Sequence, residues 1–192
     1  MKVLVACEES QTVCIEFRKL GHEAYSCDLL PCSGGHPEWH IQDDAVKILW
    51  SQNWDLVIAH PPCTRLANSG VRWLAERNLW EELYDACNFF NHFTLYGKLG
   101  HKIAIENPIP HKYAIKLIGK YNQIIQPYQF GHNESKATCL WLYGVALLIP
   151  TCYVTNYKQS TWKCPPGPDR QKIRSKTFAG IAKAMATQWS NI

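Results

Sequence analysis

The segment His60-Pro61-Pro62-Cys63 places a reactive side chain directly after an apolar run, WDLVIA. The two prolines restrict the backbone, so the cysteine that follows them would have a rigid mount. A thiolate attacks electron-poor carbon atoms, which makes Cys63 a candidate nucleophile. The alternative is a turn with an incidental cysteine, because the chain has nine cysteines.

A second segment, Glu106-Asn107-Pro108, comes at the end of the apolar run KIAIE. A carboxylate at the end of a buried strand is costly unless it is hydrogen-bonded or faces a ligand. Taken alone, Asn-Pro is also typical of an ordinary turn. Together with Cys63, however, Glu106 would give one substrate both a nucleophile and an acid.

The elements that must position these residues form an alternating pattern of short apolar runs and helical periods. This pattern predicts an α/β fold with a doubly wound, mostly parallel, Rossmann-like sheet. We expect strands over 2–7, 23–28, 54–59, 102–106 and 138–142, and helices over 10–20, 75–98, 111–120 and 177–189. Ligands of open α/β sheets bind at the carboxyl ends of the strands, so residues that follow the strands should surround one site.

The length of 192 residues and the composition, with 46% apolar and 19% charged residues, are typical of one globular domain spanning 1–192. No apolar run is long enough to span a membrane, and the run that opens the chain is too short for a secretory signal, so we expect a cytoplasmic protein. Nine cysteines without a CxxC pair indicate reduced, mostly buried thiols. The net charge of +4 permits a polyanionic partner without requiring one.

The Pro-Cys and Glu-Asn segments, in this order on successive strands, resemble motifs of the C5-cytosine methyltransferases. In that family a Pro-Cys loop is followed by Ser and Gly, and a later strand ends in Glu-Asn-Val. Here Pro62-Cys63 precedes Ser69-Gly70, and Glu106-Asn107 is followed by Pro108 instead of valine. The family's Gln-x-Arg-x-Arg element is matched by Glu134, Lys136 and Thr138.

Nearly the whole chain is also similar to short phage and prophage proteins of the DNA-methylase-like type. The shared stretches include VACEES, SCDLL, HPPCT, ENP, QFGH, KATCLWL and PPGPDR. This resemblance implies the host cytoplasm as the location. Residues 145–175 form a short loop-rich insert where larger enzymes carry a target-recognition domain. The resemblance therefore implies a substrate of low sequence specificity, a free nucleotide, or a protein partner that recognises the target.

The resemblance implies that S-adenosylmethionine donates a methyl group to C5 of cytosine in DNA or in a deoxycytidine nucleotide. Cys63 would attack C6, Glu106 would stabilise N3, and Lys136 would lie near the base's O2 or a phosphate. A Glu106 that donates a hydrogen bond to N3 would need a raised pKa, which burial can supply. The residues implied on the substrate side are Asn68, Ser69, Gly70 and Asn107.

The resemblance also implies the cofactor-binding residues. Ala6, Cys7 and Glu8 follow the first strand, at the place where the family has a glycine-rich turn. Asp28 would bind the ribose hydroxyls and Asp44 the adenine amino group, and the remaining implied contacts are His60 and Pro61. Asp28 and Asp44 could instead be ordinary turn or helix-cap residues.

Two rival functions remain open. His60-Pro61-Pro62-Cys63 could be a variant of the Pro-Pro-aromatic motif of amino-methyltransferases, although Cys63 cannot stack on a base. Alternatively the chain could be a non-catalytic binding protein with the same fold, since the turn after its first strand has no glycine.

Two further groups of residues have ordinary interpretations. Cys27, Cys32, His36 and His40 lie within fourteen residues, but the intervening glycines and proline favour a histidine-bearing surface loop over a zinc site, so no metal is expected. Four basic residues between 170 and 176 could contact phosphate, but a solvated face is the more ordinary interpretation.

Overall fold

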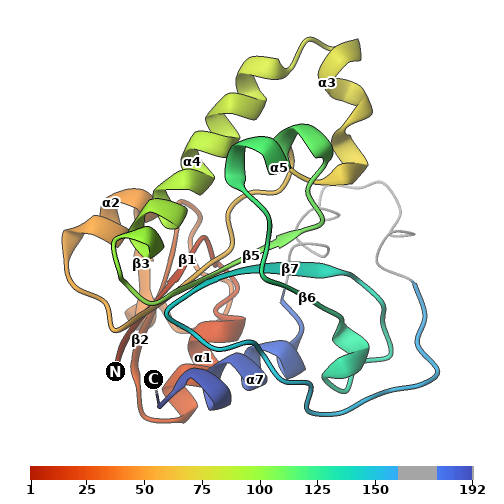
Figure 1. The fold of residues 1–192 in the computed structure, drawn as a ribbon. Helices are drawn as coiled ribbons and strands as arrows, with labels where there is room; N and C mark the ends of the chain where they lie inside the picture. Colours follow the sequence, from red (N-terminus) through yellow and green to blue (C-terminus); the bar gives the residue numbers. More distant parts are fainter. Residues whose placement is uncertain (160–176, 192) are drawn as a thin grey trace.

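The sheet of this protein has seven strands in the order β3-β2-β1-β4-β5-β7-β6 (Figure 1). The structure, a computed structural model, describes residues 1–159 and 177–191. The strands are β1 (Lys2–Ala6), β2 (Glu23–Asp28), β3 (His40–Gln42), β4 (Leu56–Ala59), β5 (Ile103–Pro108), β6 (Gln123–Ile125) and β7 (Thr138–Tyr143). Neighbouring strands from β3 through β5 are parallel, and β7 is antiparallel to both β5 and β6. The expected α/β class with a mostly parallel sheet is confirmed.

The strand order reverses between β1 and β4, which is the topological switch point of a Rossmann-like sheet. The registers are aligned there, because Ala6 at the end of β1 pairs with Cys27 of β2 and with Ala59 of β4. The chain therefore leaves β1, β2 and β4 at one edge of the sheet.

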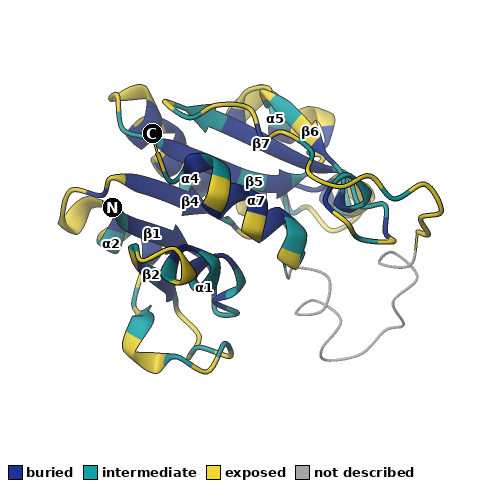
Figure 2. Ribbon diagram, turned by 90° about the horizontal axis from the view of Figure 1, so that it is seen from below, coloured by how far each residue is buried: buried dark blue, intermediate teal, exposed yellow. Residues whose placement is uncertain are grey.

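Helices cover both faces of the sheet (Figure 1). One face packs against α1 (Thr12–Lys19) and α7 (Ala179–Trp189). The other packs against α2 (Ala45–Ser51), α3 (Arg72–Glu76), α4 (Trp80–Lys98) and α5 (Lys112–Ile118). The strands between these layers are mostly buried, as the dark ribbons of Figure 2 show.

The two apolar clusters divide each central strand by alternate residues. In β4, Leu56 and Ile58 belong to the cluster beneath α1 and α7, whereas Val57 and Ala59 belong to the cluster beneath α4. Ala104 of β5 also lies on the α1/α7 side. Because side chains alternate along a strand, His60 and Glu106 both fall on the α1/α7 face.

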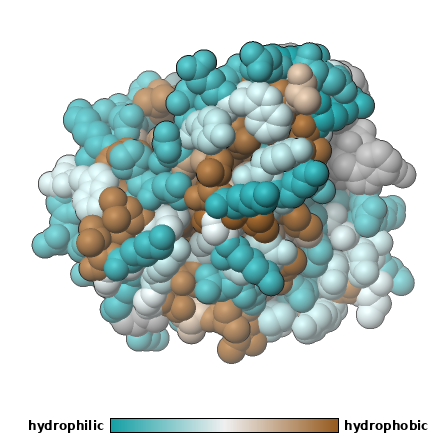
Figure 3. All heavy atoms as spheres, turned by 45° about the horizontal axis from the view of Figure 1, so that its top comes forward, coloured by the Kyte–Doolittle hydropathy of each residue, from teal (hydrophilic) through white to brown (hydrophobic). Residues whose placement is uncertain are grey.

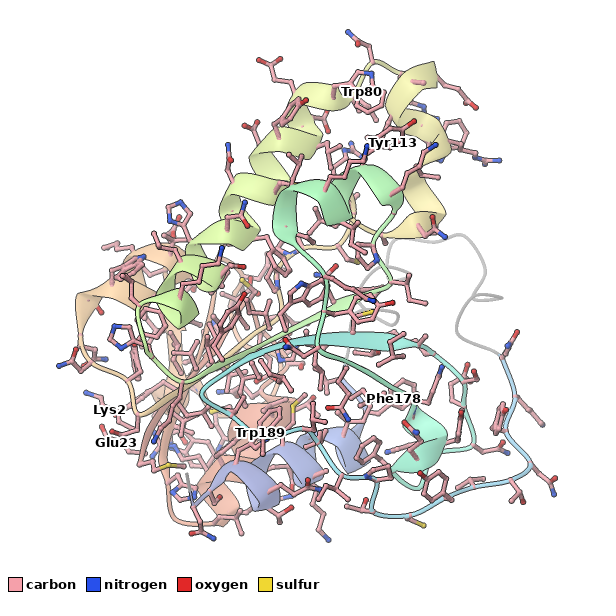
Figure 4. All side chains as sticks on the ribbon, in the orientation of Figure 1. Lys2, Glu23, Trp80, Tyr113, Phe178 and Trp189 are labelled. Atoms are coloured by element: carbon pink, nitrogen blue, oxygen red, sulfur yellow. The ribbon has the colours of Figure 1, made fainter. Side chains whose placement is uncertain are left out.

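The expected helix over 75–98 is two helices, α3 and α4. The break lies at residues 77–79, where Asn78 takes a left-handed backbone conformation with φ 51°. Beyond the break, Trp80 at the start of α4 packs edge-on against Tyr113 of α5, with ring centroids 5.1 Å apart (Figure 4). This contact places α5 beside the first turn of α4.

Several short elements were not predicted: β3, α2, β6 and three 3-10 helices, Pro37–Trp39, Asn68–Gly70 and Pro127–Gln129. Elements of three to seven residues are too short to show a clear hydrophobic period. The residues that were predicted as strands and the four expected helical regions otherwise appear with shifted ends.

The surface on the α3 to α5 side is mostly hydrophilic, with separate hydrophobic patches (Figure 3). Within residues 1–159 and 177–191, no helix has both the length and the apolar character needed to cross a membrane. Of the expected loop-rich insert, residues 145–159 contain neither helix nor strand and make isolated bridges to Phe130 and Glu134. Its remainder and the basic residues between 170 and 176 lie outside the described residues.

Candidate active site

A direct contact joins the segments that follow β4 and β5. Nδ1 of His60 lies 2.8 Å from Oε2 of Glu106, and both side chains are nearly buried, with 11% and 13% of their surface exposed. The two residues are 46 positions apart in the chain, so the contact depends on the pairing of β4 with β5 and on the shared sheet face. It places the Glu106 carboxylate beside His60, which lies three positions before the candidate nucleophile Cys63.

Each residue of this pair favours the charged form of the other. Burial by itself would raise the pKa of Glu106, but the hydrogen bond and charge of His60, with the charge of Lys136, outweigh it and lower that pKa. Burial opposes the charged form of His60 as well, yet the bond and charge of Glu106 and the charge of Glu8 raise the pKa of His60. The raised pKa that was expected for Glu106 is therefore not found. The expectation considered burial alone, whereas the structure places His60 beside the carboxylate.

Asn107 fixes the loop that carries Cys63. Its Nδ2 donates to the carbonyl oxygen of Pro61 at 2.7 Å, and its Oδ1 is buried with no partner among the described residues. After the loop, the carbonyl of Cys63 accepts from the backbone N–H groups of Leu66 and Ala67 at 3.0 and 2.9 Å. Cys63 itself is half-buried, in a turn that is held from both sides.

His111 is a positioning residue that sequence reasoning missed. Its Nδ1 accepts from the backbone of Ala114 at 3.1 Å, so the Nε2–H donates to the carbonyl of Arg65 at 2.8 Å. The backbone N–H of His111 also donates to Leu66 at 3.0 Å. A histidine as the first residue of the expected helix over 111–120 was the available signal, but its hydrogen bonds to the segment after Cys63 depend on the tertiary structure.

The implied substrate residues Asn68, Ser69 and Gly70 form a 3-10 helix directly after this loop. The backbone N–H of Asn68 donates to Ile109 at 3.0 Å, which holds the helix beside the segment that follows β5. Asn68 and Ser69 are exposed, whereas a Cβ at Gly70 would approach the carbonyl of Thr64 to 3.1 Å. The structure therefore brings these residues near Asn107 and the Cys63 loop.

Lys136 precedes β7 and lies close enough to His60 and Glu106 for its charge to affect both. Its Nζ is 5.8 Å from the ring centroid of Phe178, the residue before α7 that Figure 4 labels. The structure therefore brings Lys136 near the His60–Glu106 pair, and the contact with the base's O2 or a phosphate that the resemblance implies stays a prediction.

The turn after β1 takes a conformation that usually requires glycine. Cys7 has φ 60°, in the left-handed region, although the turn contains no glycine. The side chain of Glu8 points into the start of α1, where its two oxygens accept from the N–H groups of Val13 and Cys14 at 2.7 and 3.2 Å. Burial raises the pKa of Glu8, which the charge of His60 and these bonds partly offset. Any cofactor contact here therefore involves the backbone more than the Glu8 carboxylate.

Burial raises the pKa of the Cys7 thiol, and the charges of the nearby Asp28 and Asp44 carboxylates raise it further. Each has a local bond. Asp28 Oδ1 accepts from the backbone of Leu30 at 3.0 Å, and Asp44 Oδ1 caps α2. Asp28 therefore acts as a turn residue and Asp44 as a helix cap, as the alternative to cofactor binding proposed. Oδ2 of each aspartate takes no part in these local bonds.

The cysteines as a group, and His40 of the possible zinc site, lie in ordinary structural environments. Eight cysteines are described and all are free thiols. Four of them are buried, Cys14, Cys27, Cys87 and Cys139, so the prediction that most of the cysteines are buried holds for only half of those described. Burial raises the pKa of Cys27 and of Cys139 to about 12. In the described part of the chain, no three His, Cys, Asp or Glu residues are placed to hold a metal ion. His40 instead bonds to Ser26 and to the Leu30 carbonyl.

No protein-family model matches this sequence, and no curated protein shows significant sequence similarity to it. The chemistry of the site therefore has to be argued from its residues. They place a hydrogen-bonded carboxylate and imidazole at the carboxyl ends of β4 and β5, with a half-buried cysteine three positions after the imidazole, beside the switch point of the sheet.

Proposed function

We propose that this protein transfers a methyl group from S-adenosylmethionine to C5 of cytosine, in DNA or in a deoxycytidine nucleotide, with Cys63 as the nucleophile. The contact that carries the proposal is the 2.8 Å bond between His60 and Glu106. Together with the bond from Asn107 to Pro61, it holds the Cys63 loop and the end of β5 as one unit. A nucleophile and a carboxylate can then meet the same base.

In the proposed reaction the Cys63 thiolate forms a bond to C6 of the base, and the displaced electron pair spreads over C5, C4 and N3. Glu106, as a carboxylate, accepts a hydrogen from the 4-amino group and binds N3 once N3 takes a proton from water. S-adenosylmethionine would supply an electrophilic methyl group on its sulfonium, so that C5 would form a bond to this methyl group while the methyl–sulfur bond breaks and the neutral thioether leaves. A base then removes the C5 proton, the C5–C6 double bond re-forms as the C6–sulfur bond breaks to release the Cys63 thiolate, and N3 returns its proton to water.

The residues at the ends of β1, β2 and β3 fit the proposed cofactor. Two carboxylates, Asp28 and Asp44, lie around the turn at Cys7, and each uses Oδ1 for its local bond. A ribose offers hydroxyl donors and an adenine offers an amino donor, so acceptor oxygens suit both. The left-handed conformation of Cys7 is one that glycine adopts readily, which is compatible with a turn at the place where the family has glycines.

The decisive experiment is a methyl-transfer assay with labelled S-adenosylmethionine on duplex DNA, single-stranded DNA and deoxycytidine nucleotides. The same substrates carrying fluorine at C5 should trap Cys63 covalently, because no base can remove fluorine after methyl transfer. Mass spectrometry should find the adduct only when the cofactor is present. Cys63→Ser should abolish it, and Cys152→Ser, at an exposed cysteine, is the matched control.

The rival functions predict other outcomes. Amino-methyl transfer gives methylation without an adduct, because the exocyclic nitrogen attacks the methyl group directly. A binding protein gives neither product, and calorimetry would then report only ligand binding. Methylation with Cys63→Ser fully active would rule out the C5 mechanism.

A further inference from the structure

The proposed reaction gives His60 no chemical step of its own, although its bond to Glu106 joins the two segments of the site. His60 lies near two acidic residues, the nearly buried Glu106 at the end of β5 and the buried Glu8 in the turn after β1. Its Nδ1 contacts Glu106, whereas its Nε2 is buried and has no partner among the described residues. Because the Nδ1 contact to Glu106 is the hydrogen bond that the buried His60 ring makes, the ring restricts the orientation of the Glu106 carboxyl group.

The bond to His60 uses only one oxygen of Glu106. With Oε2 accepting from the Nδ1–H, rotation of the carboxyl group would break a 2.8 Å charge-assisted bond in a nearly dry environment. Oε1 is the oxygen that this bond leaves for another donor. The orientation of Glu106 toward a ligand is therefore coupled to His60.

We propose that His60 is a positioning residue that fixes the Glu106 carboxylate, so that Oε1 is presented to an N–H edge of the base. This inference rests on the proposed function for the identity of the ligand as a base. A carboxylate held in this way accepts hydrogen bonds, which favours cytosine, with its 4-amino group, over uracil or thymine, whose 4-oxygen would be repelled.

The charged and titratable groups that face His60 come from three separate segments. Glu106 and Glu8 favour the imidazolium, and Lys136 opposes it. Loss of the His60 proton at alkaline pH would leave Glu106 as a buried carboxylate without its partner charge. Methyl transfer should therefore have an alkaline limit that depends on His60.

The test compares His60→Asn, His60→Leu and the matched control His92→Asn, at an exposed histidine of α4. The first readout is the titration of the Glu106 carboxyl carbon by ¹³C NMR in glutamate-labelled protein, assigned with Glu106→Gln. We expect its pKa to rise by about 1–3 units in His60→Leu, because an opposite charge at hydrogen-bond distance shifts a carboxyl by that amount. His60→Asn keeps a donor without the charge and should give a smaller rise, and His92→Asn should give none.

The second readout is the pH profile of single-turnover methyl transfer. We expect the alkaline limit to disappear in His60→Asn and the rate to fall by about 10–100-fold in His60→Leu. If His60→Leu does not fold, His60→Asn decides both readouts. A Glu106 carboxyl that titrates as in the wild type in both His60 variants would overturn the positioning role. The NMR titration needs no methyl transfer, so an inactive wild-type protein would contradict the proposed function and leave the effect of His60 on Glu106 measurable.

Discussion

The two halves of the carboxyl edge of this sheet use their polar residues differently. At the ends of β4 and β5, side chains bind partners from another strand, as His60 binds Glu106 and Asn107 binds Pro61. At the ends of β1, β2 and β3, the acidic side chains bind backbone close to them in the chain. Glu8 accepts from the start of α1, and Asp44 caps α2.

This difference indicates where each half is preorganised. The β4/β5 half is held by tertiary hydrogen bonds, so removing a side chain there should disturb its partner on the other strand. In the β1/β2 half, the local hydrogen bonds shape turns and the starts of helices. A ligand would contact the carboxylate oxygens and backbone groups that these local bonds do not use. Chemical effects should therefore be larger in the first half and binding effects should dominate in the second.

The largest effect is expected for Glu106→Gln. The amide keeps the shape of the side chain but removes the charge, and a positioned acid–base group contributes about 10²–10⁴-fold to rate. We expect methyl transfer to fall by about 10³-fold with little change in cofactor affinity, measured by single-turnover assay and calorimetry. A fall in cofactor affinity with an unchanged rate would contradict the separation of the two halves.

The second effect concerns stability. His60→Leu leaves the Glu106 carboxylate buried without its partner and should lower the free energy of unfolding by about 3–5 kcal/mol, measured with urea. The double variant with His60→Leu and Glu106→Leu should recover most of this loss, because no buried charge is left at this pair. A double variant no more stable than His60→Leu would show that the pair is not coupled.

The pH dependence of stability should report the same pair. His60 has a raised pKa, so its contribution is complete below the ordinary histidine value and is lost as pH rises through its folded pKa. Glu106 has a lowered pKa, so its contribution is complete above the ordinary glutamate value and is lost as pH falls through its folded pKa. The stability difference between the wild type and the double variant should be largest between about pH 4.3 and about pH 6.5. A difference that does not vary between pH 3 and pH 9 would contradict the pair's titration.

On the other half, Asp28→Ala should weaken binding of S-adenosylmethionine by about 1–3 kcal/mol, through the loss of a charged hydrogen-bond acceptor. Isothermal titration calorimetry would measure it. Asp55→Ala is a suitable control, because Asp55 lies before β4 and bonds to Lys2, at the opposite end of β1. Unchanged affinity in folded Asp28→Ala would remove Asp28 from the site.

The smallest effect separates conformation from side-chain chemistry in the turn after β1. Cys7 has a left-handed backbone, which costs a non-glycine residue about 1 kcal/mol. Cys7→Gly should therefore be more stable than Cys7→Ala by about 1 kcal/mol, measured by thermal or urea unfolding. Equal stability of the two variants would show that this turn is not strained.

Much of the fold was predictable from sequence because it depends on local patterns. Apolar runs such as LVIA of β4 indicated the central strands, and the alternation with helices indicated a mostly parallel sheet with its site at the carboxyl edge. The sequence also indicated Cys63 as a candidate nucleophile and Glu106 as a candidate acid–base group, because each directly follows or ends an apolar run. The break before α4 was not, because the left-handed Asn78 lies inside a sequence with a continuous helical period.

Tertiary structure alone decided the state of the site. In the sequence, Glu106 stands at the end of an apolar run with no charged partner indicated. The pairing of β4 with β5 brings His60, which is 46 residues away in the chain, within 2.8 Å of it. That neighbour reverses the direction of the pKa shift that burial alone would cause. Burial can be inferred from a run of apolar residues, but the charge that compensates it depends on which strands are adjacent and which faces they share.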